Sequence, residues 1–197
     1  LYNHLQSQSE HQRLEAAYAL ASQGADGVPY LVRALRAEAA HKQERNLARA
    51  HTNPSQLDAL FALSAAGAPA LAPLENLLVD TEWPLRAAAA DALGDLGRLA
   101  VGSVPLLQRA LSDSAVWVRR NATEALGHMG SDGSEAVPAL AKRLNDPDLT
   151  VRHNAALALA KIGPSAESAA GALQAAQEDE DLYVRENARI ALSLIEA

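Results

Sequence analysis

A Val-Arg or Leu-Arg dipeptide recurs along this chain at a fixed interval of 33 residues. It stands at Leu85-Arg86, Val118-Arg119, Val151-Arg152 and Val184-Arg185. A fixed interval of this length is typical of stacked repeats, each of which is one supersecondary unit. A single unit cannot bury its apolar side alone, so neighbouring units have to cover one another. The interval therefore predicts a continuous array of stacked units.

Within each interval the apolar residues have the spacing of two helices. One stripe of a helix with 3.6 residues per turn is formed by Val118, Ala122, Ala125, Leu126 and Met129. Gly130 can end that helix, and Pro138 can open a second one that carries Leu140 and Leu144. Alanine and leucine favour helices, whereas the aromatic residues that favour strands make up only 4% of the chain. We therefore predict an all-α fold, an α-α superhelix of about six helical hairpins with the last one incomplete.

The repeats are predicted to form one domain over residues 1–197. Their approximate bounds are 9–37, 53–79, 80–112, 113–145, 146–178 and 179–197, with an insertion at 38–52. The second helix of the first repeat is expected to continue into the insertion and protrude, because no helix breaker precedes Asn53-Pro54. Ser9-x-x-Gln12 is expected to be a capping box, and the last helix is expected to run from Leu182 to Ile195.

Composition limits the classes of function. The chain has no cysteine, which excludes disulfides and thiolate chemistry, and no apolar run near the ~20 residues of a membrane span. We expect a cytoplasmic protein without a membrane partner. The net charge of −7 argues against a nucleic-acid partner, because phosphate binding needs clustered cations. The chain begins at Leu1, which leaves open that it is a domain of a longer protein.

No catalytic residue, metal site or cofactor is predicted. The six histidines do not have the spacing of a three-ligand metal site, and the glycines stand at expected helix ends rather than in a phosphate-binding loop. No Ser/His/Asp arrangement can be argued from the spacing.

The repeat pattern resembles a known family. The consensus D-x-x-x-x-[VL]-R-x-x-A-x-x-A-L-x-x-[LIM]-G, followed by V-P-x-L, is similar to HEAT repeats, most of all to the short bacterial variety also found in phycobilin lyases. The resemblance implies that first helices line the convex side of the array and second helices the concave side. Some HEAT-like hydroxylases bind iron through His-Glu dipeptides, but this chain has His153-Asn154 at that place. The resemblance therefore implies no metal site here.

An aspartate precedes each repeated arginine by six residues. These aspartates are Asp80, Asp113, Asp146 and Asp179. They could contact a ligand, but we interpret them as helix caps that join a ladder of hydrogen bonds and charges between repeats, because an aspartate near a helix N-terminus is favourable.

Cations recur on the second helices, four residues after each opening proline. They are Arg33, Arg109 and Lys142, with Arg143 next in sequence. One interpretation is a basic inner wall for an acidic peptide or a phosphate-bearing ligand. The other is that these cations complement the dipole at the helix C-terminus. The sequence leaves both open.

Another recurring pair lies on the first helices, at Trp117/Asn121, Thr150/Asn154 and Tyr183/Asn187. It is similar to the Trp-x-x-x-Asn ladder of armadillo repeats, where asparagine amides bind an extended peptide backbone. The alternative is that these residues pack one repeat against the next.

Taken together, these features predict a non-enzymatic protein–protein interaction scaffold that binds an acidic or extended peptide segment. The alternative is a subunit or accessory domain of an enzyme, either phycobilin lyase-like or the tail of a larger catalytic polypeptide. Leu157 and Ile190 are expected on an outward face, and with the unpaired last helix they suggest homo-oligomers through an open C-terminal end.

Overall fold

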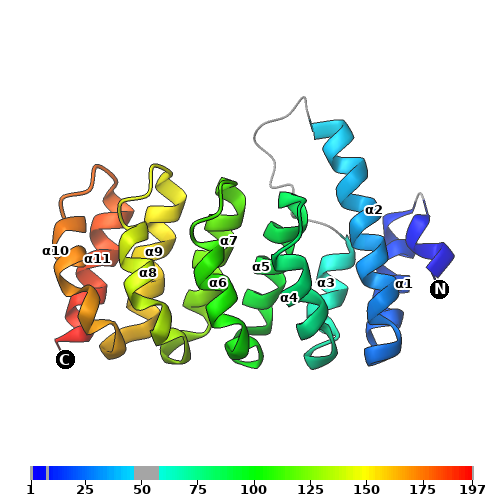
Figure 1. Ribbon diagram of the computed structural model, residues 1–197, viewed down its shortest axis with the longest axis horizontal. Helices are drawn as coiled ribbons and strands as arrows, with labels where there is room; N and C mark the ends of the chain where they lie inside the picture. The colour runs from blue at the N-terminus through cyan, green and yellow to red at the C-terminus, as the bar shows by residue number, and fades with distance from the viewer. Residues whose placement is uncertain (1, 8, 47–57, 197) are drawn as a thin grey trace.

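The computed structural model of the protein describes residues 2–7, 9–46 and 58–196, and every regular element in this part is helical. The helices alternate between two layers (Figure 1). The first layer holds α1 (Glu10–Ala21), α3 (Asp58–Ala65), α5 (Trp83–Leu96), α7 (Val116–His128), α9 (Leu149–Ile162) and α11 (Leu182–Ile195). The second layer holds α2 (Val28–Asn46), α4 (Leu71–Leu78), α6 (Val104–Ala110), α8 (Val137–Arg143) and α10 (Ala170–Ala176). The predicted array of helical hairpins, with α11 as the incomplete last one, is confirmed.

Short 3-10 helices connect the two layers. They are η2 (Gly24–Asp26), η3 (Ala68–Ala70), η4 (Gly97–Ser103), η5 (Gly130–Ala136) and η6 (Gly163–Ala169), and η1 (Tyr2–Gln6) precedes α1. Gly97 and Gly130 have φ angles of +51° and +57° at the ends of their first helices. Side chains with a Cβ rarely adopt this conformation, so glycine allows the chain to leave the helix there.

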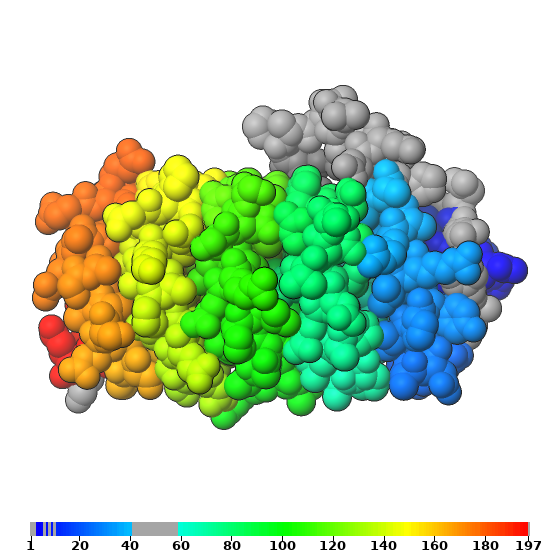
Figure 2. Space-filling model, viewed as in Figure 1, coloured from blue at the N-terminus to red at the C-terminus, as the bar shows by residue number. Residues whose placement is uncertain are grey.

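One apolar core runs through the whole array, from Leu5 in η1 to Leu192 in α11. Leu93, Leu126 and Leu159 occupy the same position in three successive repeats and are fully buried. First helices of neighbouring repeats pack closely because small residues face one another. A Cβ on Gly127, for example, would lie 3.1 Å from the Cα of Ala158. The repeats follow in chain order along the long axis (Figure 2), so each covers the next as the sequence predicted.

Helix α2 is the longest helix in the described part and extends beyond its neighbours (Figure 1). This agrees with the expected continuation beyond residue 37. Residues 47–57 lie outside the described residues, so the start of the second repeat at Asn53 and the repeat bounds stay predictions. The capping box at Ser9 is wrong. The Ser9 side chain makes no cap, and the Ser9 N–H donates to the Ser7 hydroxyl at 3.1 Å instead of to Gln12, whose Oε1 atom accepts from the same hydroxyl at 2.5 Å.

Candidate functional site

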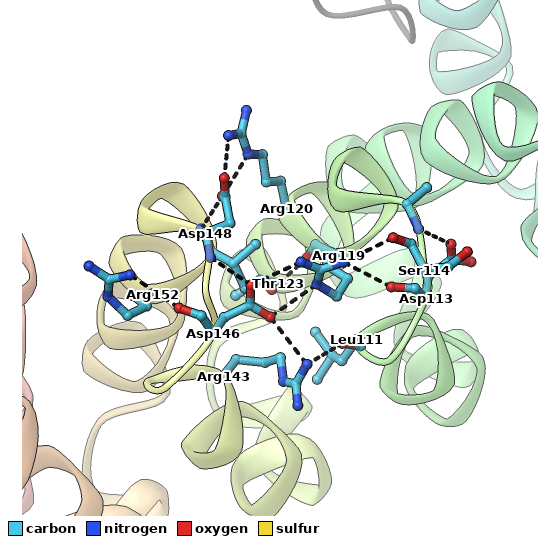
Figure 3. A network of polar contacts seen from close by, with 12 residues as sticks. Leu111, Asp113, Ser114, Arg119, Arg120, Thr123, Arg143, Asp146, Asp148 and Arg152 are labelled. Carbon is cyan, nitrogen blue, oxygen red and sulfur yellow. Dashed lines mark hydrogen bonds and ion pairs between the residues drawn. The ribbon is translucent and has the colours of Figure 1, made fainter.

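A ladder of arginine–aspartate pairs joins consecutive repeats (Figure 3). At each junction the arginine Nε and Nη2 atoms donate to the two carboxylate oxygens of the next repeat's aspartate. The distances are 2.7 and 2.9 Å for Arg86–Asp113, 3.0 and 3.0 Å for Arg119–Asp146, and 2.8 and 3.3 Å for Arg152–Asp179. Two-point pairing of this kind fixes orientation as well as charge.

Each of these aspartates also accepts a hydrogen bond from a backbone N–H of its own repeat. One oxygen of each accepts a backbone N–H from two residues further on, at 2.8 Å for Asp113 and 3.0 Å for Asp146. Burial alone would raise the pKa of Asp113, but the Arg86 hydrogen bond, the Ala115 N–H and the nearby arginine charges together hold its pKa below the ordinary value. The ladder between repeats is present as predicted, but the predicted helix caps are wrong. Asp148 caps α9 and Asp181 caps α11, whereas the residues before α5 and α7 make no side-chain cap.

Arg143 belongs to this ladder. Its Nη1 atom donates to Asp146 at 3.2 Å and to the Leu111 carbonyl at 3.1 Å. The sequence placed Arg143 beside the exposed cations of the second helices, but its side chain is half-buried at a junction between repeats. A ligand-binding role for Arg143 would require these contacts to break.

Arg120 makes a second contact between repeats, beside Trp117, that the sequence did not predict. The Arg120 guanidinium lies 4.7 Å from the centre of the Trp117 ring, and it donates two hydrogen bonds to Asp148 at 2.8 and 2.6 Å. Tyr183, at the same position two repeats later, is exposed and meets His153 edge-on at a ring distance of 6.0 Å. These contacts favour the packing interpretation for Trp117.

Two of the three asparagines donate hydrogen bonds to the preceding repeat. Asn121 is buried and its Nδ2 atom donates to the Ala87 carbonyl at 2.9 Å, and Asn154 donates to the Arg120 carbonyl at 3.4 Å. In the described part of the chain Asn187 makes no such bond and is half-buried. The amides that would bind a peptide backbone therefore bind the neighbouring repeat at two of the three positions, and peptide binding by these residues stays a prediction.

The other cations of the second helices are exposed. Arg33 lies on α2, Arg109 on α6 and Lys142 at the equivalent position of α8. Within the described residues no carboxylate forms an ion pair with Arg109 or Lys142. Two exposed cations on adjacent repeats therefore face solvent on the second-helix layer.

The first-helix layer carries a different surface. A shallow open groove of about 490 Å³ is lined by Gly94, Asp95, Gly97, Gly127, His128 and Lys161. Beside it, burial and then the negative charges of Asp95 and Glu124 raise the pKa of Asp91 to about 6. Among the described residues, no group of three or more His, Cys, Asp or Glu side chains is placed to hold a metal ion. Nor is any helix there long and apolar enough to span a bilayer.

Two family models match this chain. The model for HEAT repeats covers residues 103–193, and a second model for a single HEAT repeat covers residues 70–100. The chain is a HEAT-repeat protein. The matched residues begin at α4 and include every arginine–aspartate junction described above.

Solved structures with similar folds agree with the HEAT assignment. A designed armadillo repeat protein in complex with the peptide (KR)4 has a TM-score of 0.63 at 21% identity, with 98% of this chain and 97% of that chain covered. The complex of CpcE and CpcF of phycocyanin lyase from Nostoc sp. PCC7120 has a TM-score of 0.64 at 19% identity, with 83% and 96% covered. Kap121p has a TM-score of 0.67 at 18% identity, with 93% of this chain and 23% of that chain covered. These likenesses show the fold alone.

The comparison with curated proteins gave no match for this HEAT-repeat chain.

Proposed function

We propose that this HEAT-repeat protein is a non-enzymatic scaffold whose second-helix layer binds an acidic or extended peptide segment of a partner protein. The observation that carries the proposal is the pair Arg109 and Lys142. Most other arginines of the described repeats contact a carboxylate, as Arg86 and Arg119 do in the ladder. Arg109 and Lys142 are exposed without such a contact, so their charges are available to a ligand.

The arrangement supports a peptide rather than a compact small molecule. Packed helices lie about 8–10 Å apart, so cations on adjacent second helices suit a ligand that extends along the array. Repeat arrays commonly bind along such extended surfaces. The designed armadillo protein is named with a basic peptide, (KR)4. The exposed cations of the present chain favour a peptide of the opposite charge.

The test is a charge reversal of both cations, Arg109→Glu with Lys142→Glu, measured with a fluorescent octapeptide of alternating Asp and Glu. Exposed ion pairs contribute roughly 0.5–1 kcal/mol each, so we expect binding to weaken by about tenfold. The matched control reverses Arg98 and Lys161, which changes the net charge equally but lies off the second helices. Equal loss in both variants would show that net charge alone drives binding, and would overturn the proposal.

The enzyme-subunit alternative is favoured by one observation, the likeness to the CpcE and CpcF complex of phycocyanin lyase. A bilin-handling protein needs a cavity for a large conjugated ring system. The groove at Gly94 and His128 is open to solvent, and the space beside Asn154 and Leu157 has a volume of only about 30 Å³. We therefore expect no change in the absorbance spectrum of a free bilin on mixing with this protein. A red-shifted or sharpened band would favour the lyase-like alternative instead.

The expected homo-oligomer stays a prediction. Ile190 and Leu194 are exposed on α11, and helical periodicity places them with Tyr183 on the outward side of the first-helix layer rather than on the end of the array. Any self-association through these residues would therefore bring the first-helix layers of two copies together, and would not join the copies end to end.

A further inference from the structure

The exposed cations of the second-helix layer belong to a row of equivalent positions along the array. This row, called the Arg109 row below, consists of Asn76 in α4, Arg109 in α6, Lys142 in α8 and Ala175 in α10, which follow one another at intervals of 33 residues. All four side chains are exposed. Only the two middle positions carry a charge, so a ligand that follows the row meets one cation in each of two adjacent repeats.

A row of apolar residues lies beside the Arg109 row. This second row, called the Leu106 row below, consists of Pro73, Leu106, Ala139 and Ala172, each partly buried and each three residues before its neighbour in the Arg109 row. Residues three apart lie on one face of a helix, about 4.5 Å apart along the axis at a rise of about 1.5 Å per residue. A narrow ligand can therefore contact both rows at once.

The interval between Arg109 and Lys142 distinguishes between extended backbone conformations of the ligand. Packed helices lie about 8–10 Å apart, so the two cations recur at about that distance. In a β-strand, side chains on one face are two or four residues apart, which is about 6.6 or about 13 Å at about 3.3 Å per residue. In polyproline II, every third side chain points the same way after an advance of about 9.3 Å. The polyproline II interval fits the repeat, and both strand intervals miss it.

A polyproline II ligand also has the cross-section that the two rows require. Its three residues per turn form three edges, and two of these edges face a surface on which the ligand lies. Acidic side chains along one edge would meet Arg109 and Lys142, while prolines along the next edge would pack on Leu106 and Ala139. Because proline already fixes φ near about −65°, such a ligand loses little conformational entropy on binding.

We infer that the second-helix layer binds a proline-rich segment in the polyproline II conformation with acidic residues three positions apart. The inference rests on the proposed function, to which it adds the backbone conformation of the ligand and the spacing of its acids. The minimal segment is Glu-Pro-Pro-Glu, since prolines at both intervening positions place a proline on the Leu106 row in either chain direction. Two acids suffice, because Asn76 and Ala175 carry no charge.

The probes are capped, fluorescently labelled peptides of one composition that differ only in the interval between two glutamates: PPEPPEPP, PPEPEPPP and PEPPPEPP. Binding is followed by fluorescence anisotropy at low salt, because salt screens exposed charges. We expect the interval of three to bind about three- to fivefold more tightly than the intervals of two and four, each of which keeps only one ion pair. The flexible peptide GGEGGEGG should bind at least about threefold more weakly than PPEPPEPP, since its backbone has to be ordered.

A gain of binding tests the row without depending on a destabilised variant. Asn76→Arg adds a third cation to the Arg109 row, and should strengthen binding of PPEPPEPPEPP by about three- to fivefold. The peptide PPEPEPEPPPP, of the same composition, should gain less than about twofold. The matched control is Ser131→Arg, which adds the same charge at an exposed position in η5 and should bind as the parent does.

Equal binding of the three two-acid peptides, equal binding of the glycine and proline peptides, or equal gains for Asn76→Arg and Ser131→Arg would each overturn the inference. The variant with both Arg109→Glu and Lys142→Glu separates that failure from failure of the proposed function. If the peptides lose binding to this variant whatever their spacing, the proposed function stands without the polyproline II register. If none of them does, both proposals are wrong.

Discussion

Asp146 is the most enclosed carboxylate of the ladder, with 3% of the residue exposed. It accepts hydrogen bonds from Arg119, Arg143 and the Asp148 N–H. Burial alone would raise its pKa, but these donors and the two arginine charges lower the pKa below its ordinary value. The contribution of Asp146 to stability is therefore fully present above its unfolded pKa of 3.8 and is lost as the pH falls through its lower folded pKa.

Replacing this carboxylate should reveal how strongly a junction depends on it. We expect Asp146→Ala to lower the free energy of unfolding by about 2–4 kcal/mol, because two arginines lose a buried partner. Urea unfolding followed by circular dichroism at pH 7 measures the change. The control is Asp132→Ala, which breaks the exposed Arg98–Asp132 pair and should cost less than about 1 kcal/mol. Equal costs would contradict a structural role for the ladder.

Asp91 has the opposite pH behaviour. Its pKa in the folded protein is about 6, above the ordinary 3.8, because of burial and the neighbouring Asp95 and Glu124 charges. Folding therefore favours the protonated form, and the cost of ionising Asp91 grows as the pH rises from about 4 to about 6. Asp91→Asn should stabilise the protein by about 1–2 kcal/mol at pH 8 and by much less at pH 4.5. Asp26→Asn, which removes an exposed carboxylate in η2 away from Asp91, is the control. A gain that does not change with pH would show that Asp91 titrates normally.

At the scale of the helices, close contact between first helices depends on residues without large side chains. A Cβ on Gly127 of α7 would lie 3.1 Å from both the Cα and the Cβ of Ala158 in α9. Gly127→Ala should therefore destabilise the protein by roughly 1–3 kcal/mol through overpacking. Gly171→Ala in α10, where nothing lies within 4 Å, should instead stabilise it by about 0.5–1 kcal/mol through helix propensity. We expect thermal denaturation to show a lower melting temperature for Gly127→Ala and a higher one for Gly171→Ala. Shifts of both melting temperatures in the same direction would contradict the packing of α7 on α9.

The helices show what periodicity can and cannot predict. The bounds of α11, Leu182–Ile195, are those predicted from its stripe and its preceding aspartates. Pro69 opens η3 and α4 begins at Leu71, two residues before Pro73, so a proline does not by itself mark the first residue of a second helix. The contacts of Arg120 with Asp148 and of Arg143 with Asp146 were missed, because neither pair recurs in the other repeats. Periodicity gives the face of the helix on which a side chain lies. The residue that it contacts depends on the distance between that helix and the next one.

At the scale of the molecule, all described repeats form one continuous row. The ladder and the shared core fix each hairpin on the next, and this places Arg109 and Lys142 at equivalent positions of adjacent repeats. Val79, Ser112, Asn145 and Glu178 are exposed at equivalent positions of four repeats. Because the chain contains no native cysteine, spin labels can be attached to single introduced cysteines at these positions.

Distances between such labels, measured by double electron–electron resonance, test the row directly. Pairs two repeats apart, 79/145 and 112/178, should give narrow and similar distributions near about 20 Å, and the pair three repeats apart, 79/178, a distribution near about 30 Å, since packed helices are about 10 Å apart. A distance for 79/178 equal to or shorter than the two-repeat distances would contradict a single row of stacked hairpins.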